Sequence, residues 1–391
     1  MKICMLTTSY PRFKTDWCVP FIGNLAKELA KTDNEIHIVT SHGAKTKDFE
    51  TMSGVKIHRF QYFFPKKAQT LTYQGGMLES YSHSLSAKVQ APFFILSFFF
   101  KALKVARDCD VIHAHWIVSG LVAVLIKKLL RKPVLLTVWG AGIRTMPKFI
   151  SKFVLKNVDL VNSFQPELTD IVKSLGRKKG IVDIPSMIDY GKFNRNVDNK
   201  KFLEEFNLKG KSVISFIGRL EAMKDPITFV RAIPHVTNKV KNVRFLIVGG
   251  GHLMEAVKKE IEKLKMDDFV RLTGPRYDTH VVLKSSTIFA TISPLENVYS
   301  TTIIESMQME TPCILSTAGY TPKVFKHKHY AYLVPCKNPK ALADAIILLL
   351  KNKKLRKKLS SNGRKFIKEH GFAKEHIVKE TCRVYKSLIK K

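Results

Sequence analysis

Short apolar runs rich in β-branched residues alternate with longer stretches whose apolar residues recur at helical spacing. In the first half of the chain the pattern predicts strands at 3–7, 36–40, 55–60, 111–115, 134–138, 159–163 and 181–185. It predicts helices between them, at 21–30, 87–106, 120–130 and 166–175. Continuously apolar strands separated by helices are typical of a buried parallel sheet.

A polar stretch at 189–211 interrupts this alternation, which then starts again. Strands are predicted at 213–217, 245–250, 270–274, 288–292, 313–316 and 332–335. Helices are predicted from 226, over 254–264, from 301, from 339 and over 374–389, where Ile377, Tyr385 and Leu388 fall near one face. A chain of 391 residues is also long for a single core. We therefore predict two doubly wound α/β domains joined near residue 190.

The charge of the chain is unusual. Sixty-six Lys and Arg against 32 acidic residues give a formal net charge of +34 and a pI near 9.9. Such a field attracts nucleic acid, anionic membranes or phosphate-bearing substrates. A lysine-rich solvated surface explains the same numbers, so charge alone leaves these alternatives open.

Cysteines and apolar segments indicate a reducing compartment and no membrane span. The six cysteines show no CxxC or Cys/His ligand spacing, which predicts free thiols and no structural zinc. The N-terminus reads as a first strand and not as a signal peptide. The apolar run 93–100 is shorter than the roughly 18–20 residues that cross a bilayer. It is expected either as a buried helix or as a patch that rests on a membrane.

Candidate chemistry appears at the ends of two predicted strands of the second half. Ligands of open α/β sheets bind beyond the carboxyl ends of the strands. The segment ISFIGRLEAMKD (214–225) ends a strand at Gly218, follows it with Arg219, whose planar fork suits phosphate oxygens, and adds Lys224. The alternative is a pair of ordinary exposed cations in a basic chain.

The second segment, 292–316, carries Glu296 and Asn297 in a loop before a helix. Ser300 is expected to cap this helix, and the N–H groups from Ser300 to Ile303, including Thr301 and Thr302, are expected to form an anion site. Glu305 lies one turn into the helix and is placed to accept hydrogen bonds from ribose hydroxyls. An ordinary capped helix is the alternative.

Taken together, these motifs resemble those of the retaining group 1 glycosyltransferases of the GT-B type. GRLxxxK is followed about eighty residues later by a carboxylate loop, a Glu-bearing helix and TPCI. The resemblance extends to VGGGHLMEAVKKEIEKL, DVIHAHWIVSGL, KPVLLTVWG, IPSMIDYGKF and the closing VYKSLI, and so covers nearly the whole chain.

The resemblance implies two Rossmann-like doubly wound parallel-sheet domains that face a central cleft. Residues 1–188 would bind the acceptor, 189–372 the nucleotide sugar, and 373–391 would form a helix that crosses back to the first domain. Arg219 and Lys224 would stabilise the leaving pyrophosphate, and Glu305 would bind the ribose. Glu296 would contact the donor sugar.

Several positions depart from the family pattern. Two Glu residues eight apart are usual, whereas Glu296 and Glu305 are nine apart, so either Glu296 or Asn297 makes the sugar contact. Asp225 stands where Gly is usual, and Trp17-Cys18-Val19-Pro20 replaces a Gly-Gly pair. Trp139 stands where the family often has a His near the reacting sugar. His113 and His115 are the remaining imidazoles there, with His115 as the catalytic candidate and His113 and Trp139 on the acceptor side.

The predicted activity is transfer of a hexose from a nucleotide-diphosphate sugar to a hydroxyl of a glycan or lipid-linked acceptor. The donor is a co-substrate, and whether it is a UDP-, GDP- or ADP-sugar is left open. No cofactor, metal or nucleic-acid partner is expected. We expect a cytoplasmic enzyme. A peripheral position on the inner face of the membrane, with the anionic membrane surface as a partner, is left open. The alternatives are a nucleotide-sugar epimerase or hydrolase of the same fold, a basic nucleic-acid-binding protein, and a catalytically silent homologue.

Overall fold

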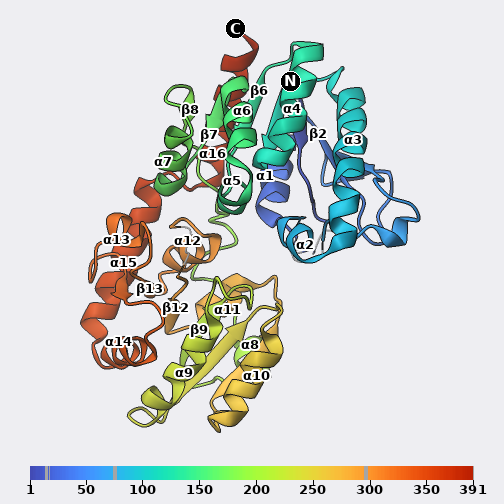
Figure 1. The fold of residues 1–391 in the computed structure, drawn as a ribbon. Helices are drawn as coiled ribbons and strands as arrows, with labels where there is room; N and C mark the ends of the chain where they lie inside the picture. Colours follow the sequence, from blue (N-terminus) through green and yellow to red (C-terminus); the bar gives the residue numbers. More distant parts are fainter. Residues whose placement is uncertain (14–15, 17, 74–76, 295–297, 391) are drawn as a thin grey trace. The chain divides into compact units, whose positions relative to one another are not determined.

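The structure, a computed structural model, describes residues 1–13, 16, 18–73, 77–294 and 298–390. The chain forms two compact units (Figure 1). The first comprises Met1–Met187 together with Lys374–Lys391, and the second comprises Ile188–Ala373. The C-terminal helix therefore belongs to the unit in which the chain begins.

An eight-stranded sheet in the order β3-β4-β2-β1-β5-β6-β7-β8 forms the centre of the first unit. Its strands are β1 (Lys2–Leu6), β2 (Glu35–Ser41), β3 (Phe49–Met52), β4 (Val55–Phe60), β5 (Val111–His115), β6 (Val134–Thr137), β7 (Leu160–Asn162) and β8 (Ile181–Val182). Neighbouring strands are parallel except at the edge, where β3 pairs with β4 antiparallel. The strand order reverses direction between β1 and β5.

Helices cover both faces of this sheet and bury its apolar side chains. They are α1 (Pro20–Ala30), the 3-10 turn η1 (Lys66–Ala68), α2 (Met77–His83), α3 (Leu85–Ala106), α4 (Trp116–Leu130), α5 (Gly140–Thr145), α6 (Lys148–Asn157), α7 (Pro166–Ser174) and α16 (Lys374–Ile389). One apolar core joins the sheet to α3, α4, α6 and α7. A second core joins it to α1 and α16, and it includes Ile377, Tyr385 and Leu388. The predicted apolar face of the last helix is confirmed.

The second unit is built on a six-stranded, fully parallel sheet in the order β11-β10-β9-β12-β13-β14. Its strands are β9 (Ser212–Ile217), β10 (Val243–Val248), β11 (Val270–Gly274), β12 (Ile288–Thr291), β13 (Cys313–Ser316) and β14 (Tyr332–Val334). Counted along this unit, the order is 3-2-1-4-5-6, that of a dinucleotide-binding Rossmann sheet. The point at which the order reverses lies between β9 and β12.

The helices of the second unit bury two apolar cores, one on each face of the sheet. They are α8 (Lys200–Glu205), α9 (Pro226–Thr237), α10 (Met254–Lys263), α11 (Thr279–Ser285), α12 (Thr301–Gln308), α13 (Thr321–Val324), α14 (Pro339–Lys351) and α15 (Lys353–Glu369). The predicted fold class, two parallel-sheet α/β domains, is confirmed.

The apolar run 93–100 lies inside helix α3, Leu85–Ala106, which matches the predicted helix 87–106 closely. Helix α3 has 22 residues and is long and apolar enough to cross a membrane by length and composition. The length of the run 93–100 therefore understates the apolar segment, because the helix begins at the Ser84 cap, well before the run. One face of α3 is nonetheless part of the core, with Phe94 and Phe98 fully buried.

Candidate functional site

The segment predicted to bind the donor lies at the carboxyl end of β9, beside the point where the strand order of the second unit reverses. The loop after β9 is tied to the loop after β10 by backbone hydrogen bonds. Gly218 N–H donates to the Val248 carbonyl at 3.0 Å, and Leu220 N–H donates to the Gly250 carbonyl at 2.9 Å. These bonds fix where the backbone on either side of Arg219 lies.

Two glycines of the β10 loop make this close approach possible. A Cβ atom at Gly249 would lie 1.9 Å from the Gly218 carbonyl oxygen, and one at Gly251 would lie 2.5 Å from the Leu220 carbonyl oxygen. Gly249 has a φ of +143°, which favours glycine. The VGGG segment thus has a specific structural task, which is to let the two loops pack against each other.

Arg219 is held by a buried carboxylate while its side chain remains 45% exposed. Its Nη1 donates to Glu221 Oε1 at 2.7 Å, and its Nη2 lies 3.4 Å from the Met223 sulfur. A guanidinium has five N–H donors, so the bond to Glu221 orients the group and leaves donors for an anion. Glu221 is the feature that the sequence analysis missed.

Lys224 and Asp225 complete the loop. The side chain of Lys224 runs beside Gly218, with its Cγ and Cδ 3.9 Å from the position that a Cβ atom would take there. Asp225 has a φ of 50°, in the left-handed region, which explains why Gly is usual at this position. Its carboxylate caps α9 by accepting from the Thr228 N–H at 3.2 Å and from the Thr228 hydroxyl at 2.8 Å. The carboxylate is thus used by a helix start.

The start of α12 differs from the expectation in two respects. Ser300 is the N-cap residue, but its side chain makes no cap hydrogen bond and lies 3.4 Å from the Thr302 hydroxyl. Ile303 is buried, and its N–H donates to the Ser300 carbonyl at 3.1 Å. The prediction that the Ser300 side chain caps the helix is wrong. The Ile303 N–H is already hydrogen-bonded within the first turn of the helix, so it is not free to bind an anion. Thr301 and Thr302 are the remaining candidates from this turn.

Glu305 lies one turn into α12, as predicted. It is partly exposed and accepts a hydrogen bond from the Thr279 hydroxyl at 3.4 Å. Burial raises the pKa of its carboxyl from 4.5 to about 7, against the opposing effects of nearby Lys192 and of the Thr279 bond. Near neutral pH the Glu305 carboxyl therefore exchanges between its protonated form, which can donate a hydrogen bond, and its ionised form, which can only accept. Glu296 and Asn297, the other two candidates of this segment, lie outside the described residues.

The imidazole candidates lie in the first unit, at the end of β5. His113 is buried, with Nδ1 2.7 Å from the Tyr385 hydroxyl of α16 and Nε2 2.8 Å from the Thr137 hydroxyl of β6. Burial lowers its pKa to about 3. Both ring nitrogens are engaged within the unit, while the ring lines the same cavity as His115 and Trp139, so the placement of His113 on the acceptor side stays a prediction.

His115 is also buried, but one of its nitrogens has no hydrogen-bond partner in the described part of the chain. Its Nδ1 accepts from the Trp139 indole N–H at 3.4 Å, and its Nε2 is the atom without a partner. Burial and His113 hold its pKa well below the ordinary value, so the ring is neutral. Because Nδ1 accepts, the proton lies on Nε2, which makes this atom a hydrogen-bond donor and not a base.

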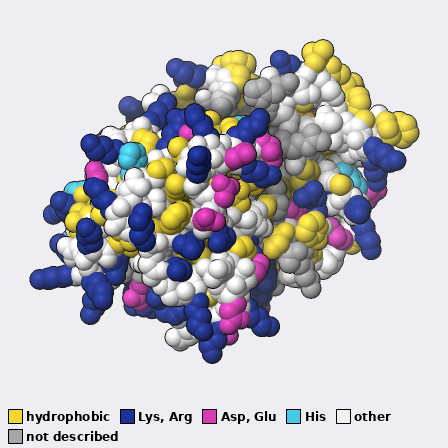
Figure 2. All heavy atoms as spheres, turned by 90° about the horizontal axis from the view of Figure 1, so that it is seen from below, with side chains coloured by type: hydrophobic (Ala, Val, Ile, Leu, Met, Phe, Trp, Pro, Cys, Tyr) yellow, Lys and Arg dark blue, Asp and Glu magenta, His cyan; other side chains and the backbone are white. Residues whose placement is uncertain are grey.

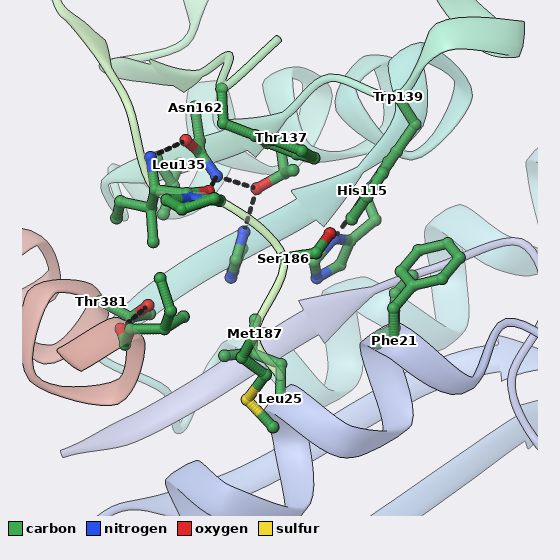
Figure 3. A pocket seen from close by; sticks show the side chains of 16 residues that line it. Phe21, Leu25, His115, Leu135, Thr137, Trp139, Asn162, Ser186, Met187 and Thr381 are labelled. Atoms are coloured by element: carbon green, nitrogen blue, oxygen red, sulfur yellow. Dashed lines mark hydrogen bonds between the residues drawn. The ribbon is translucent and has the colours of Figure 1, made fainter. Parts of the chain in front are cut away.

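His115 and Trp139 line a cavity in the first unit. Figure 3 shows both facing the same space as Phe21, Thr137, Asn162 and Ser186. The cavity has a volume of about 30 Å³, which is room for about one or two water molecules. The Trp139 ring packs on Phe21, with centroids 4.2 Å apart. Trp139 therefore forms an aromatic wall here and has no group that can move a proton.

The loop after β1 keeps a glycine-like backbone without glycine. Val19, in the segment that replaces the family's Gly-Gly pair, has a φ of 51° and precedes α1. A left-handed conformation costs a non-glycine residue roughly 1–2 kcal/mol. This turn is therefore formed at a cost in stability. Trp17 lies outside the described residues.

Comparisons with known proteins identify the family. Residues 198–366 match the profile described as glycosyl transferases group 1, and residues 18–164 match the glycosyl transferase 4-like domain. The chain belongs to the group 1 glycosyltransferases.

Relatives of this glycosyltransferase include a Bacillus anthracis protein named N-acetyl-alpha-D-glucosaminyl L-malate synthase. It is 22% identical over 95% of this chain and 96% of its own. A Campylobacter jejuni N-acetylgalactosaminyltransferase, named for an undecaprenol-diphosphate-linked substrate, is 29% identical over 44% of this chain and 46% of its own. Identities this low show shared ancestry and leave the substrates of this chain to be determined.

Solved structures show the same fold. Sucrose-phosphate synthase from Thermosynechococcus elongatus has a TM-score of 0.81 at 19% identity and covers 100% of this chain and 99% of its own. Anabaena HepE in complex with UDP and glucose has a TM-score of 0.76 at 14% identity, covering 99% and 100%. The glycosyltransferase thus has the GT-B architecture, with two parallel-sheet α/β domains.

Within the described residues of this glycosyltransferase, no group of three or more His, Cys, Asp or Glu side chains is arranged to hold a metal ion. The loop at the end of β9 carries two cations, Arg219 and Lys224, and its two carboxylates are already used, Glu221 by Arg219 and Asp225 by the start of α9. The two cations suit an anion.

Proposed function

We propose that this glycosyltransferase moves a hexose, with retention of configuration, from a nucleotide-diphosphate sugar to an acceptor hydroxyl. The second unit would bind the donor. One observation carries the proposal: a family-matching GRLxxxK loop is fixed at the strand-order reversal, with Arg219 oriented by Glu221 and Lys224 beside Gly218. This is where open α/β sheets bind their ligands.

In this proposal the two cations act on the leaving group. Breaking the bond from the sugar C1 to the phosphate oxygen leaves negative charge on the diphosphate. Arg219 and Lys224 would stabilise that charge more strongly in the transition state than in the bound donor, which lowers the barrier. The N–H groups of Thr301 and Thr302 would add donors at the positive end of α12.

Glu305 and the loop before α12 would orient the rest of the donor. The carboxylate of Glu305 would accept hydrogen bonds from the ribose hydroxyls, and either Glu296 or Asn297 would contact the sugar. On a front-side route the acceptor oxygen bonds to C1 on the face that the diphosphate leaves. The acceptor proton then passes to the departing phosphate oxygen. This route needs neither a pair of catalytic carboxylates nor a metal ion.

We propose that the first unit holds the acceptor. The cavity beside His115 has room for only about one or two water molecules, so the acceptor would lie against its aromatic wall, Phe21 and Trp139, and not inside it. The Nε2–H of His115 would be a hydrogen-bond donor within the cavity. Sugars and apolar chains both pack on aromatic rings, so a glycan or a lipid-linked acceptor fits this chemistry. The Campylobacter relative is named for a lipid-linked substrate, which supports testing lipid-linked acceptors. Because such an acceptor would lie in a membrane, we also propose that the enzyme is cytoplasmic and acts at the inner membrane face.

The donor can be identified by thermal shift. Purified protein is titrated with UDP, GDP and ADP and then with their hexose derivatives. A ligand present at about 100 times its Kd stabilises the folded state by about 2.7 kcal/mol. HepE was solved with UDP and glucose, so UDP-hexoses come first. No shift with any nucleotide would contradict the proposal.

The activity test uses Arg219→Ala and Lys224→Ala, with Arg231→Ala and Lys239→Ala as matched removals of surface cations. Loss of a group that stabilises transition-state charge lowers kcat by roughly 10²–10³. We expect that loss in the first pair only, with all four variants still folded by circular dichroism. Unchanged turnover in the first pair would refute the assignment. Release of free or epimerised sugar without acceptor would favour a hydrolase or an epimerase.

A further inference from the structure

Three neighbouring helices cover one face of the sheet in the first unit, and their outer sides combine apolar rows with lysines. Helices α3, α4 and α6 lie in this order, with α3 packed on α4 and α4 packed on α6 (Figure 1). We call the outer surface of these helices the α3–α4–α6 face. Its exposed apolar residues are Leu85, Val89, Phe93, Leu96, Phe100, Leu125, Leu129, Phe149 and Phe153.

The apolar residues of α3 form a continuous stripe. Leu85, Val89, Phe93, Leu96 and Phe100 are each 51–78% exposed. At 3.6 residues per turn their spacing places all five within about a quarter of the helix circumference. The buried residues of α3, such as Phe94 and Phe98, lie on the opposite side. The stripe is thus a second apolar face of a helix whose first apolar face is already in the core.

The stripe continues onto the neighbouring helices as a patch held by a cation–π contact. Leu125 and Leu129 are one turn apart on α4, and Phe149 and Phe153 are one turn apart on α6. The ammonium of Lys128 on α4 lies 5.2 Å from the centre of the Phe153 ring. Apolar side chains and lysine stems therefore share one surface on these two helices.

All charged residues on these three helices are lysines. There are three on α3, two on α4 and three on α6, and the three helices contain no Asp or Glu. Lys88 and Lys104 flank the two sides of the α3 stripe. By contrast, other helices of the unit carry acidic residues, among them Glu28 on α1, Glu167 and Asp170 on α7, and Glu375 and Glu380 on α16. Figure 2 shows Lys and Arg spread over another view of the surface, so charge alone would not distinguish the α3–α4–α6 face.

We propose that the α3–α4–α6 face docks on an anionic lipid bilayer, whichever donor and acceptor the enzyme uses. Leu and Phe side chains would enter the boundary between headgroups and acyl chains, while the lysines would extend to the phosphates. A second copy of the chain fits less well, because a symmetric contact would bring two all-lysine surfaces together. Nucleic acid fits less well, because phosphate contacts make no use of exposed Phe and Leu.

The test is co-sedimentation of the full chain with vesicles of phosphatidylcholine alone or mixed equally with phosphatidylglycerol. We expect binding to the anionic vesicles only, with affinity falling as salt rises. The apolar variant is Phe93→Ser/Leu96→Ser/Phe100→Ser, with Phe49→Ser/Ile389→Ser as exposed apolar controls. The charge variant is Lys88→Glu/Lys104→Glu/Lys148→Glu/Lys152→Glu. Its control makes the same change at Lys27, Lys379, Lys386 and Lys390, on and next to α1 and α16.

Both face variants should lose about tenfold or more in vesicle affinity, and the controls should lose less than about twofold. An equal loss in the charge control would mean that the whole basic molecule attracts the membrane, and would overturn the proposal. So would unchanged binding in the apolar variant, or a concentration-dependent dimer that the face variants abolish. Thermal shift with the nucleotide donor should be unchanged in every variant, which separates this surface from the donor site.

Discussion

At the scale of single residues, the raised pKa of Glu305 makes stability depend on pH. In the unfolded chain this carboxyl has its ordinary pKa near 4.5, and in the folded chain the pKa is about 7. The folded state therefore binds more protons between these values, and the contribution of Glu305 to stability falls as pH rises through that window. Glu305→Gln removes this dependence. We expect the Tm of the variant relative to wild type to rise from pH 5 to pH 8 in scanning calorimetry, and a constant difference would contradict the burial of this carboxyl.

The same titration bears on donor binding. An ionised carboxylate accepts stronger hydrogen bonds from ribose hydroxyls than a neutral carboxyl does. We expect nucleotide affinity, measured by calorimetric titration, to increase about three- to tenfold from pH 6 to pH 8 in wild type. Glu305→Gln should bind more weakly and show a flat profile. Parallel profiles in the two proteins would remove Glu305 from the donor site.

Tyr385 offers a test of the buried His113 network. Its hydroxyl lies 2.7 Å from His113 Nδ1 and joins α16 to β5. Tyr385→Phe leaves this nitrogen buried without a partner, which costs about 1–3 kcal/mol. We expect a matching drop in the free energy of unfolding by urea denaturation. Tyr81→Phe, at an exposed tyrosine, serves as the control and should change stability by less than about 0.5 kcal/mol.

The residues of the donor site could be proposed from sequence because their position follows from topology. Arg219 and Lys224 come directly after a strand that the pattern marks clearly, and the carboxyl end of such a strand is where ligands bind. Glu221 could not be assigned to Arg219 in advance, since pairing two residues apart depends on the turn geometry of one loop. His113 and His115 could not be told apart either. Their partners, Tyr385 and Trp139, are distant in sequence.

At the scale of elements, the contact between the loops after β9 and β10 can be tested through Gly249. A Cβ atom there would overlap the Gly218 carbonyl oxygen at 1.9 Å, so Gly249→Ala must push the two loops apart. We expect a Tm loss of several degrees and a nucleotide affinity at least about tenfold weaker. Gly210→Ala is the matched control, because Gly210 also has a positive φ of 71° but has open space around it. It should lower stability by only about 1 kcal/mol and leave nucleotide binding intact.

Parallel strands could be predicted both at the centre and at an edge of a sheet, whereas the antiparallel edge strand could not. β5 and β13, which are buried throughout, match the predicted ranges 111–115 and 313–316, and the parallel edge strand β11 matches 270–274. β3 was missed: it is an edge strand whose residues are all at least partly exposed, so it shows no apolar run. Helices α5, α6 and α11 were also missed. They have 6, 10 and 7 residues, which leaves little length for a helical repeat of apolar residues.

At the scale of the whole molecule, the +34 charge predicts how stability responds to salt. Like charges repel more strongly in the compact state than in the expanded chain, so screening should favour folding. The Debye length falls from about 30 Å at 0.01 M to about 8 Å at 0.15 M. Exposed ion pairs such as Lys258–Glu255 weaken over the same range, but each contributes only about 0–1 kcal/mol.

We therefore expect Tm to rise by a few degrees between 10 and 150 mM NaCl, measured by scanning fluorimetry without nucleotide. Each Lys→Glu change lowers the net charge by two, so the variant altered at Lys27, Lys379, Lys386 and Lys390 should start from a higher Tm at low salt and gain less on screening. A Tm that falls with salt would mean that attractive pairs outweigh the net repulsion. In that case the basic surface would stabilise the folded chain. The alternative, that the positive charge destabilises the fold but serves to bind anions, would then be wrong.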